Sequence, residues 1–148
     1  MLLRIFLAPT SFLAAIIWTI WAEAAEPIMV LAPFNLTGPQ AVLGAPCYKG
    51  AELAVEKLNA AGGVLGRPIE LIPIDTASQV SRTTNELEGA LERYPNATAG
   101  IGHTDSTYAL DAGRVFQKAG IRFITPGATA PDLPHQVGRL RSSRSTMV

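Results

Sequence analysis

The stretch GAELAVEKLNAAGGVLGRP, residues 50–68, decides the fold of this chain. Its first part has the apolar spacing of an amphipathic helix, and Gly62 and Gly63 supply the positive φ with which helices commonly end. A short turn then leads into residues 69–74, a continuous apolar run of strand length. Another such run, residues 28–34, precedes the helix. The stretch therefore predicts one unit made of a strand, a helix and a second strand.

The expected helix follows Pro46 and has two distinct faces. Its charged and polar face carries Lys49, Glu52, Glu56 and Asn59. Its apolar face, which we expect to pack on the sheet, consists of Cys47, Ala51, Ala54, Val55, Leu58 and Ala61. Cys47 is the only cysteine of the chain, so we interpret it as a small buried side chain without chemistry of its own.

The same alternation continues towards the C-terminus. Ser78 or Ser81 is expected to cap a second helix, which carries Leu87, Ala90, Leu91 and Tyr94 and stops at Pro95. Residues 97–101 and 121–124 have the composition of short strands. Between them Asp105 or Ser106 can cap a third helix, with Ala109, Ala112, Val115, Phe116 and Ala119 on its apolar face. Strands separated by helices form parallel sheets through right-handed crossovers, so the predicted fold class is α/β, a doubly wound parallel sheet.

That architecture predicts the position of the functional site. Ligands of open wound sheets bind at the carboxyl ends of the strands, near the point where the strand order reverses. The segments expected there are 35–46, 102–107 and 125–129. The second leads directly into a helix N-terminus, where unpaired backbone N–H groups and the helix dipole favour a small anion.

Composition limits the classes of partner. The chain has 12 basic and 12 acidic residues, so no basic surface is available for phosphates and we expect no nucleic-acid partner. Its 148 residues correspond to about one domain.

The N-terminus has the pattern of an export signal. Arg4 precedes an apolar run over residues 5–21, and Ala22, Glu23 and Ala24 have the small-x-small pattern that signal peptidase cleaves. We interpret residues 1–24 as a cleavable signal peptide. An uncleaved membrane anchor is the alternative, since residues 5–25 are just long enough to span a bilayer. Either interpretation predicts export.

The segment GHTDSTYALDAGRVFQKAGIRFITPGATAPDL, residues 102–133, carries the most specific resemblance, together with residues 50–68. Over residues 28–133 the chain resembles the type I periplasmic solute-binding proteins of ABC transporters, and in particular the leucine/isoleucine/valine-binding receptors. The resemblance implies an extracytoplasmic receptor located in the periplasm. It also implies a small amino acid or amide as ligand, a membrane permease as partner, and no cofactor.

The resemblance further implies which residues bind. In that family a serine of the first loop and an Ala-Thr pair of the second hold the α-carboxylate and α-ammonium of an amino acid, which by position are Ser106, Gly127, Ala128 and Thr129. Hydroxyls of Ser106 and Thr129 can donate to a carboxylate, and a glycine at 127 lets a ligand approach closely. The alternative to ligand binding is a purely structural role, in which Ser106 only caps a helix and Thr129 only provides a hydroxyl to a turn. Leu36, Thr37 and Gly38 are expected to shape the same crevice or to form a purely structural turn.

Other chemistries fit the sequence less well. His103, Asp105 and Ser106 are neighbours in one loop and cannot readily adopt the geometry of a hydrolase triad, so we expect no enzyme. The loop after the first strand lacks G-x-G-x-x-G, which disfavours a dinucleotide, and Asp75 is interpreted as a capping or surface acid. The two histidines, 103 and 135, have no second ligand at metal-site spacing, so no metal is expected.

The C-terminus departs from the family pattern. Complete members have two α/β lobes, whereas this sequence stops soon after its fourth predicted strand. Residues 25–134 are therefore interpreted as the N-terminal ligand-binding lobe, with the second lobe absent. Residues 135–148 are interpreted as a disordered or frame-shifted tail, because they carry Arg139, Arg141 and Arg144 without an apolar period. The resulting hypothesis is a truncated receptor with half a binding site. The alternative is a ligand-sensing module of the same fold that acts in signalling as a dimer.

Overall fold

The computed structural model describes residues 25–131, 133 and 141–142. The expected signal peptide, residues 1–24, lies outside the described residues, and so does most of the expected tail, residues 135–148. The elements in chain order are β1 (Ile28–Phe34), α1 (Ala41–Ala60), β2 (Ile69–Asp75), α2 (Val80–Arg93), β3 (Ala99–Ile101), α3 (Ser106–Lys118), β4 (Arg122–Thr125) and β5 (Arg141–Ser142).

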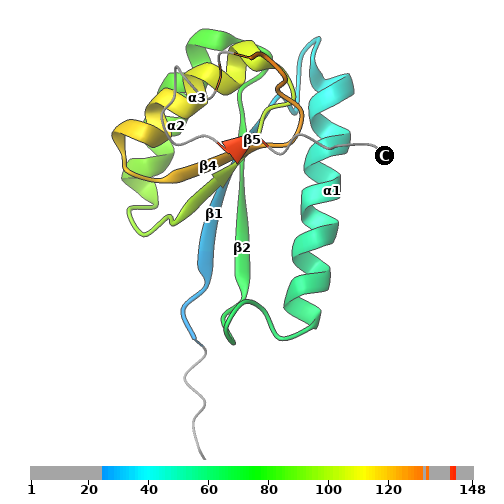
Figure 1. The fold of residues 1–148 in the computed structure, drawn as a ribbon, viewed down its shortest axis with the longest axis vertical. Helices are drawn as coiled ribbons and strands as arrows, with labels where there is room; N and C mark the ends of the chain where they lie inside the picture. The colour runs from blue at the N-terminus through cyan, green and yellow to red at the C-terminus, as the bar shows by residue number, and fades with distance from the viewer. Residues whose placement is uncertain (1–24, 132, 134–140, 143–148) are drawn as a thin grey trace, which may run out of the picture.

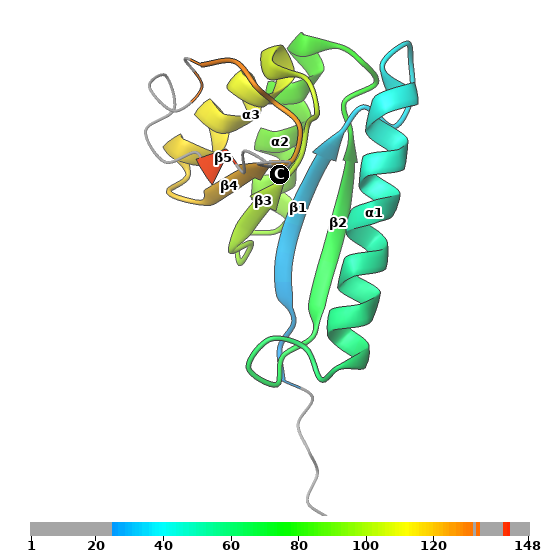
Figure 2. The same ribbon diagram turned by 45° about the vertical axis from the view of Figure 1, so that its right-hand side comes forward.

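The strands form one parallel sheet in the order β2-β1-β3-β4-β5. The step from β1 to β2 runs in one direction, and the steps from β2 to β3 and β4 run in the other. Right-handed crossovers therefore place α1 on one face of the sheet and α2 and α3 on the opposite face, as Figure 1 and Figure 2 show. This confirms the predicted doubly wound sheet. Strand order reverses between β1 and β3, where ligands of such sheets bind.

The larger hydrophobic core lies between the sheet and the helices α2 and α3. Leu31 of β1 is fully buried there, and the rings of Phe116 and Phe123 stack with their centroids 4.9 Å apart. Gly100 of β3 makes room for that packing, because a Cβ at this position would overlap the ring of Phe116. A smaller core beneath α1 contains Ala32, Phe34 and Tyr48.

Helix α1 differs from its prediction at its start and on its buried face. It begins at Ala41 and includes Pro46, which removes only one hydrogen bond of the early helix. Its buried residues are Gly44 and Tyr48. Ala54, Leu58 and Ala61, which were expected to pack, are exposed. The expected C-terminal turn is confirmed, since Gly62 and Gly63 have φ of 99° and 75°.

Helices α2 and α3 begin differently. The prediction that Ser78 or Ser81 caps α2 is wrong, because Gln79 holds the N-cap position and makes no side-chain cap bond. Asp105 caps α3, as expected, and its carboxylate accepts a hydrogen bond from the N–H of Thr107 at 2.8 Å. Ser106 is the first residue of α3 and is not its cap.

The outer edge of β2 has no neighbouring strand in the described sheet. Ile28 donates to the carbonyl of Pro68, so the alternation of a parallel ladder points the backbone groups of Ile69 outwards. The amide of Asn59 meets these groups: Asn59 Oδ1 accepts from the Ile69 N–H and Asn59 Nδ2 donates to the Ile69 carbonyl, both at 2.8 Å. Pro73, further along β2, has no N–H and also faces this edge.

Candidate functional site

The carboxyl ends of the parallel strands bring four loops together. Two of them are linked by hydrogen bonds: residues 35–40 after β1 and residues 76–79 after β2. The other two, residues 102–105 after β3 and 126–131 after β4, form a second pair. All three segments expected at the strand ends lie at this edge, although the first is shorter than predicted because α1 begins at Ala41.

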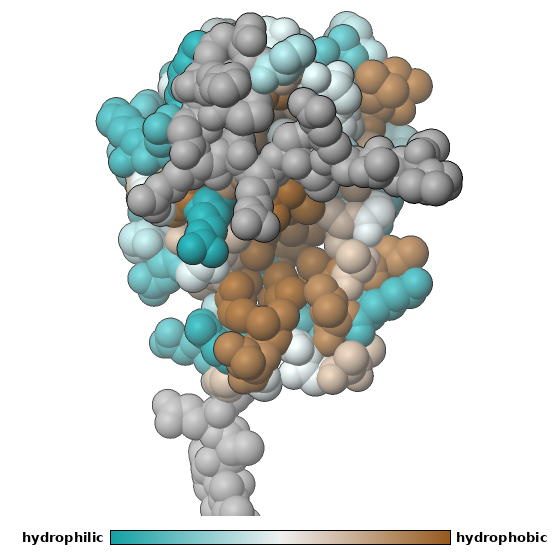
Figure 3. Space-filling view, viewed as in Figure 1, coloured by the Kyte–Doolittle hydropathy of each residue, from teal (hydrophilic) through white to brown (hydrophobic). Residues whose placement is uncertain are grey.

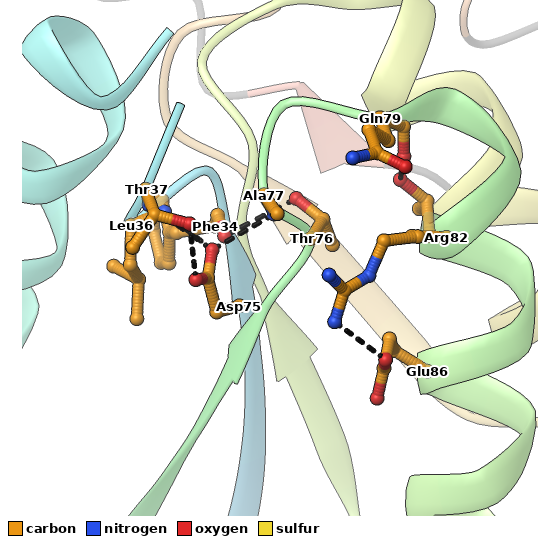
Figure 4. A network of polar contacts seen from close by, with 10 residues as sticks. Phe34, Leu36, Thr37, Asp75, Thr76, Ala77, Gln79, Arg82 and Glu86 are labelled. Carbon is orange, nitrogen blue, oxygen red and sulfur yellow. Dashed lines mark hydrogen bonds and ion pairs between the residues drawn. The ribbon is translucent and has the colours of Figure 1, made fainter. Parts of the chain in front are cut away.

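Asp75 joins the first pair of loops, as Figure 4 shows. Its Oδ1 accepts from the backbone N–H groups of Leu36, Thr37 and Ala77 at 3.0, 3.1 and 2.8 Å. Its Oδ2 accepts from the Thr37 hydroxyl at 2.6 Å. Burial of Asp75 raises its pKa, but these hydrogen bonds outweigh burial and hold the pKa below its usual value. Asp75 is thus the central acceptor of a loop anchor, a role that its interpretation as a capping or surface acid missed.

Ser78 strengthens the same junction. Its hydroxyl donates to the carbonyl of Thr37 at 2.8 Å and accepts from the N–H of Gln40 at 2.9 Å. Gly38 lies so close that a Cβ there would come within 2.8 Å of the Ser78 hydroxyl and the Ala77 carbonyl. Ala77 and Ser78 both have positive φ, 49° and 57°, a backbone conformation that L residues rarely adopt. Such strain is commonly stored at functional loops.

The second pair of loops is held by Thr125 and Ser106. The buried hydroxyl of Thr125 donates to the His103 carbonyl at 2.6 Å and accepts from the Ala128 N–H at 3.2 Å. Ser106 Oγ accepts from the N–H of Ala130 at 3.1 Å. Because the oxygen is the acceptor in this contact, the hydroxyl hydrogen of Ser106 stays available for another acceptor.

The predicted site residues lie on this second pair. Ala128 is buried, while Gly127 and Thr129 are exposed. A Cβ at Gly127 would approach the backbone and side chain of Thr104 to 3.0 to 3.2 Å, so the glycine allows close contact between the two loops. Asp105 places a carboxylate at the N-terminus of α3, where the dipole favours negative charge. This charge competes with an anionic ligand at the same helix end.

His103, in the loop after β3, is a buried polar residue. The residue is 1% exposed, and neither ring nitrogen has a hydrogen-bond partner among the described residues. Burial lowers its pKa to about 4, although the charge of Asp105 acts in the opposite direction. The ring stacks on Tyr108 at 5.5 Å between centroids. The Tyr108 hydroxyl donates to the Ser78 carbonyl at 2.9 Å, which links the two pairs of loops.

Two further observations concern the described residues alone. No cluster of three or more His, Cys, Asp or Glu side chains suited to a metal ion occurs among them. None of their helices has the length and apolar character needed to cross a membrane.

Open wound α/β sheets of this class bind ligands at the carboxyl ends of their strands, where the polar loops of this chain converge. The family model described as periplasmic binding protein matches residues 27–138. The chain therefore belongs to the periplasmic binding protein family, type I, which confirms the resemblance. Membership of this family implies an extracytoplasmic location.

Individual relatives agree with this assignment. An amino acid binding protein of Pseudomonas aeruginosa is 36% identical over 97 residues, which is 66% of this chain and 26% of that protein. The Leu/Ile/Val-binding protein of Escherichia coli is 34% identical over 112 residues, 74% of this chain and 29% of its own length. Both are binding proteins by name, in agreement with the expectation that the chain is not an enzyme.

Solved structures show the same fold. The substrate-binding protein of a branched-chain amino acid transporter from Streptococcus pneumoniae, in complex with isoleucine, superposes with a TM-score of 0.73 at 30% identity. The match covers 78% of this chain and 33% of that one. The chain thus spans about a quarter to a third of the length of these relatives.

Proposed function

We propose that this chain is the N-terminal ligand-binding lobe of an extracytoplasmic receptor for a branched-chain or related amino acid or amide, which serves an ABC importer. The observation that carries the proposal is the contact between Ser106 Oγ and the Ala130 N–H. This contact fixes the serine oxygen at the junction of the two strand-end loops and leaves its hydrogen for a ligand oxygen. Relatives solved with isoleucine and with leucine support the class of ligand.

In this proposal the ligand carboxylate accepts hydrogen bonds from the hydroxyls of Ser106 and Thr129. Backbone carbonyl oxygens of the loop around Gly127 and Ala128 accept from the ammonium group. The anchored loops are held before the ligand arrives, which lowers the entropic cost of binding. The lobe supplies half of the site, and a second lobe would close over the ligand about a hinge and present the closed receptor to the permease.

The proposed location is the periplasm, reached through a cleavable signal peptide at residues 1–24. The apolar run over residues 5–21 and the pattern Ala22, Glu23, Ala24 support this proposal. N-terminal sequencing of the exported protein tests it. A mature chain that begins near Ala25 supports the proposal, and a chain that keeps residues 1–24 contradicts it.

Ligand binding is tested by titrating the chain with leucine, valine, glutamate and acetamide while backbone amide resonances are recorded. We expect weak binding, with dissociation constants of about 1 mM or above, because only half of the contacts are present. The resonances of Ser106, Thr129 and their neighbours should shift with at least one of the first two ligands. Tight binding by the lobe alone would contradict the half-site, and no shift at these loops with any ligand would contradict the proposed function.

A further inference from the structure

The first turn of α3 contacts strand-end loops on both of its sides. Successive residues of an α-helix are about 100° apart around its axis, so Ser106 and Tyr108 point in nearly opposite directions. Ser106 accepts from the N–H of Ala130, in the loop after β4, at 3.1 Å. The hydroxyl of Tyr108 donates to the carbonyl of Ser78, in the loop after β2, at 2.9 Å. One helical turn thus bridges the two pairs of loops.

The ring of Tyr108 is held in place by a buried neighbour. It stacks on the ring of His103, with the centroids 5.5 Å apart and the planes inclined by 25°. His103 is 1% exposed, and its N–H donates to the carbonyl of Pro33 of β1 at 3.0 Å. Its carbonyl accepts from the hydroxyl of Thr125 of β4 at 2.6 Å. The Tyr108 ring therefore rests on a residue that is bonded to the ends of two strands.

Ser78 connects Tyr108 to the loop after β1. While its carbonyl accepts from Tyr108, its hydroxyl donates to the Thr37 carbonyl at 2.8 Å. The same hydroxyl accepts from the N–H of Gln40 at 2.9 Å. Ser78 has a φ of 57°, which L residues rarely adopt, so bonds on both of its polar groups help to keep its backbone in that conformation. A path of hydrogen bonds thus leads from the first turn of α3 to Thr37 and Gln40.

This path crosses the point where the strand order reverses, between β1 and β3, at which wound sheets bind their ligands. Figure 3 shows the hydrophobic surface of one face gathered over the strands, lower down than these polar loops. The bonds that Asp75 accepts lie within the first pair of loops. The bond from Tyr108 to Ser78 joins that pair to α3, and the distance between the loop after β1 and Ser106 therefore depends on it.

We propose that Tyr108 is a positioning residue of the ligand site, which holds the loop after β1 at a set distance from Ser106. The proposal rests on the proposed function, because the ligand is the same amino acid or amide. Tyr108 acts through Ser78 and does not itself need to touch the ligand. Loops that are held in place before the ligand arrives lower the entropic cost of binding, so the Tyr108 hydroxyl contributes to affinity as well as to stability.

Tyr108→Phe tests the proposal, because it keeps the ring that stacks on His103 and removes only the hydroxyl. In an NMR titration of the full chain with leucine, we expect this variant to have a dissociation constant about threefold or more above that of the parent. The Gln40 amide should also exchange with solvent faster in the variant without ligand, because its acceptor, the Ser78 hydroxyl, is held less firmly.

Thr98→Val is the matched control. It also removes one hydroxyl that donates to a backbone carbonyl, that of Met29 at 3.2 Å, but it does so at the opposite end of the sheet. The control should leave the affinity for leucine and the exchange of the Gln40 amide unchanged. Circular dichroism shows whether each variant keeps the fold.

Ser78→Ala interrupts the same path one step further on, because it removes the hydroxyl that binds Thr37 and Gln40. This variant should also bind leucine more weakly than the parent. The double variant, Tyr108→Phe with Ser78→Ala, should bind no more weakly than the weaker of the two single variants, since both changes break one path. Losses that add in the double variant would overturn the path.

A Tyr108→Phe variant that is less stable than the parent but binds leucine equally well would show a structural role alone and overturn the proposal. Failure of the proposed function gives a different result, in which the parent chain binds none of leucine, valine, glutamate and acetamide. The Gln40 amide still tests the positioning in that case: faster exchange in Tyr108→Phe supports it, and an unchanged rate overturns it.

Discussion

The carboxylate of Asp75, at the end of β2, accepts a 2.6 Å hydrogen bond from the hydroxyl of Thr37, which lies 38 residues earlier in the loop after β1. Together with three backbone N–H groups that donate to the same carboxylate, this bond makes the shape of one loop depend on the other. A single side chain thus fixes two of the four loops at the strand ends.

Replacing Asp75 by alanine is expected to lower the free energy of unfolding by about 2 to 3 kcal/mol, because several N–H donors lose their acceptor. Asp75→Asn should cost less, since its amide oxygen can still accept from the backbone N–H groups. Urea unfolding measures both. Hydrogen exchange should show that the Leu36, Thr37 and Ala77 amides lose protection in the alanine variant. Equal stability of both variants and the parent would contradict the role of Asp75 as the anchor of the two loops.

The burial of His103 is expected to make the stability of the fold depend on pH. Its pKa in the folded chain is about 4, below the ordinary 6.5, so the unfolded chain binds more protons between these values. The free energy of unfolding is therefore not reduced by His103 above pH 6.5. As the pH falls towards 4, it decreases by about 3 kcal/mol in all, because His103 protonates in the unfolded chain while it stays neutral in the folded chain. Urea unfolding at pH 7 and pH 4.5 measures the loss.

The control for this prediction is His103→Asn, since asparagine tolerates the positive φ of 50° at this position. Its stability should depend less on pH over the same interval. An NMR titration in which the His103 ring of the parent chain protonates near pH 6.5 would refute the assignment.

Two glycines of α1 form a matched pair for substitution by alanine. A Cβ at Gly44 would overlap the backbone of Asn35, whereas a Cβ at Gly50 meets nothing within 4 Å. Gly44→Ala should therefore destabilise the chain by about 2 kcal/mol or more. Gly50→Ala should stabilise it by up to about 1 kcal/mol, because alanine favours the helix. Thermal unfolding of the two variants compares them directly, and equal shifts would show that the contact between α1 and Asn35 is not tight.

Alanine variants of Ser106 and Thr129 distinguish a structural role of the site from a ligand-binding role. Ser106→Ala removes the acceptor of the Ala130 N–H and should lower stability by about 1 to 2 kcal/mol as well as weaken leucine binding. Thr129 is exposed, so Thr129→Ala should weaken binding with little change in stability. NMR titration with leucine and urea unfolding provide the two measurements. Unchanged affinity in both variants would place the ligand elsewhere.

Much of the fold could be predicted from the sequence because each element has its own local pattern. The strand β1 was predicted with its observed ends, and the paired glycines marked the end of α1. The start of α1 was missed because Pro46 was taken to precede the helix, although a proline near the first turns removes only one hydrogen bond. The exposure of Ala54 and Leu58 on α1 could not be foreseen, since periodicity identifies an apolar face but not what covers it.

The candidate site was harder to predict, because its contacts join residues distant in sequence. A serine just before a helix is typical of an N-cap, yet Ser78 bonds the loop of Thr37 and Gln40 instead. The role of Asp75 follows from the register that aligns it with Phe34 of β1, which no local pattern encodes. For His103, nothing in its neighbours indicated that the ring would be buried beside Tyr108. The roles of Ser106, Gly127, Ala128 and Thr129 in ligand binding stay predictions.

The pairing of Asn59 with Ile69 has a consequence for self-association. An exposed edge strand is a template on which another chain can add a strand and start aggregation. On β2 the amide of Asn59 occupies the first outward-facing backbone groups, and Pro73 lacks the donor that an added strand would need. Strand addition is thereby obstructed at both ends of this edge. At the opposite side of the described sheet, β4 is already paired by β5.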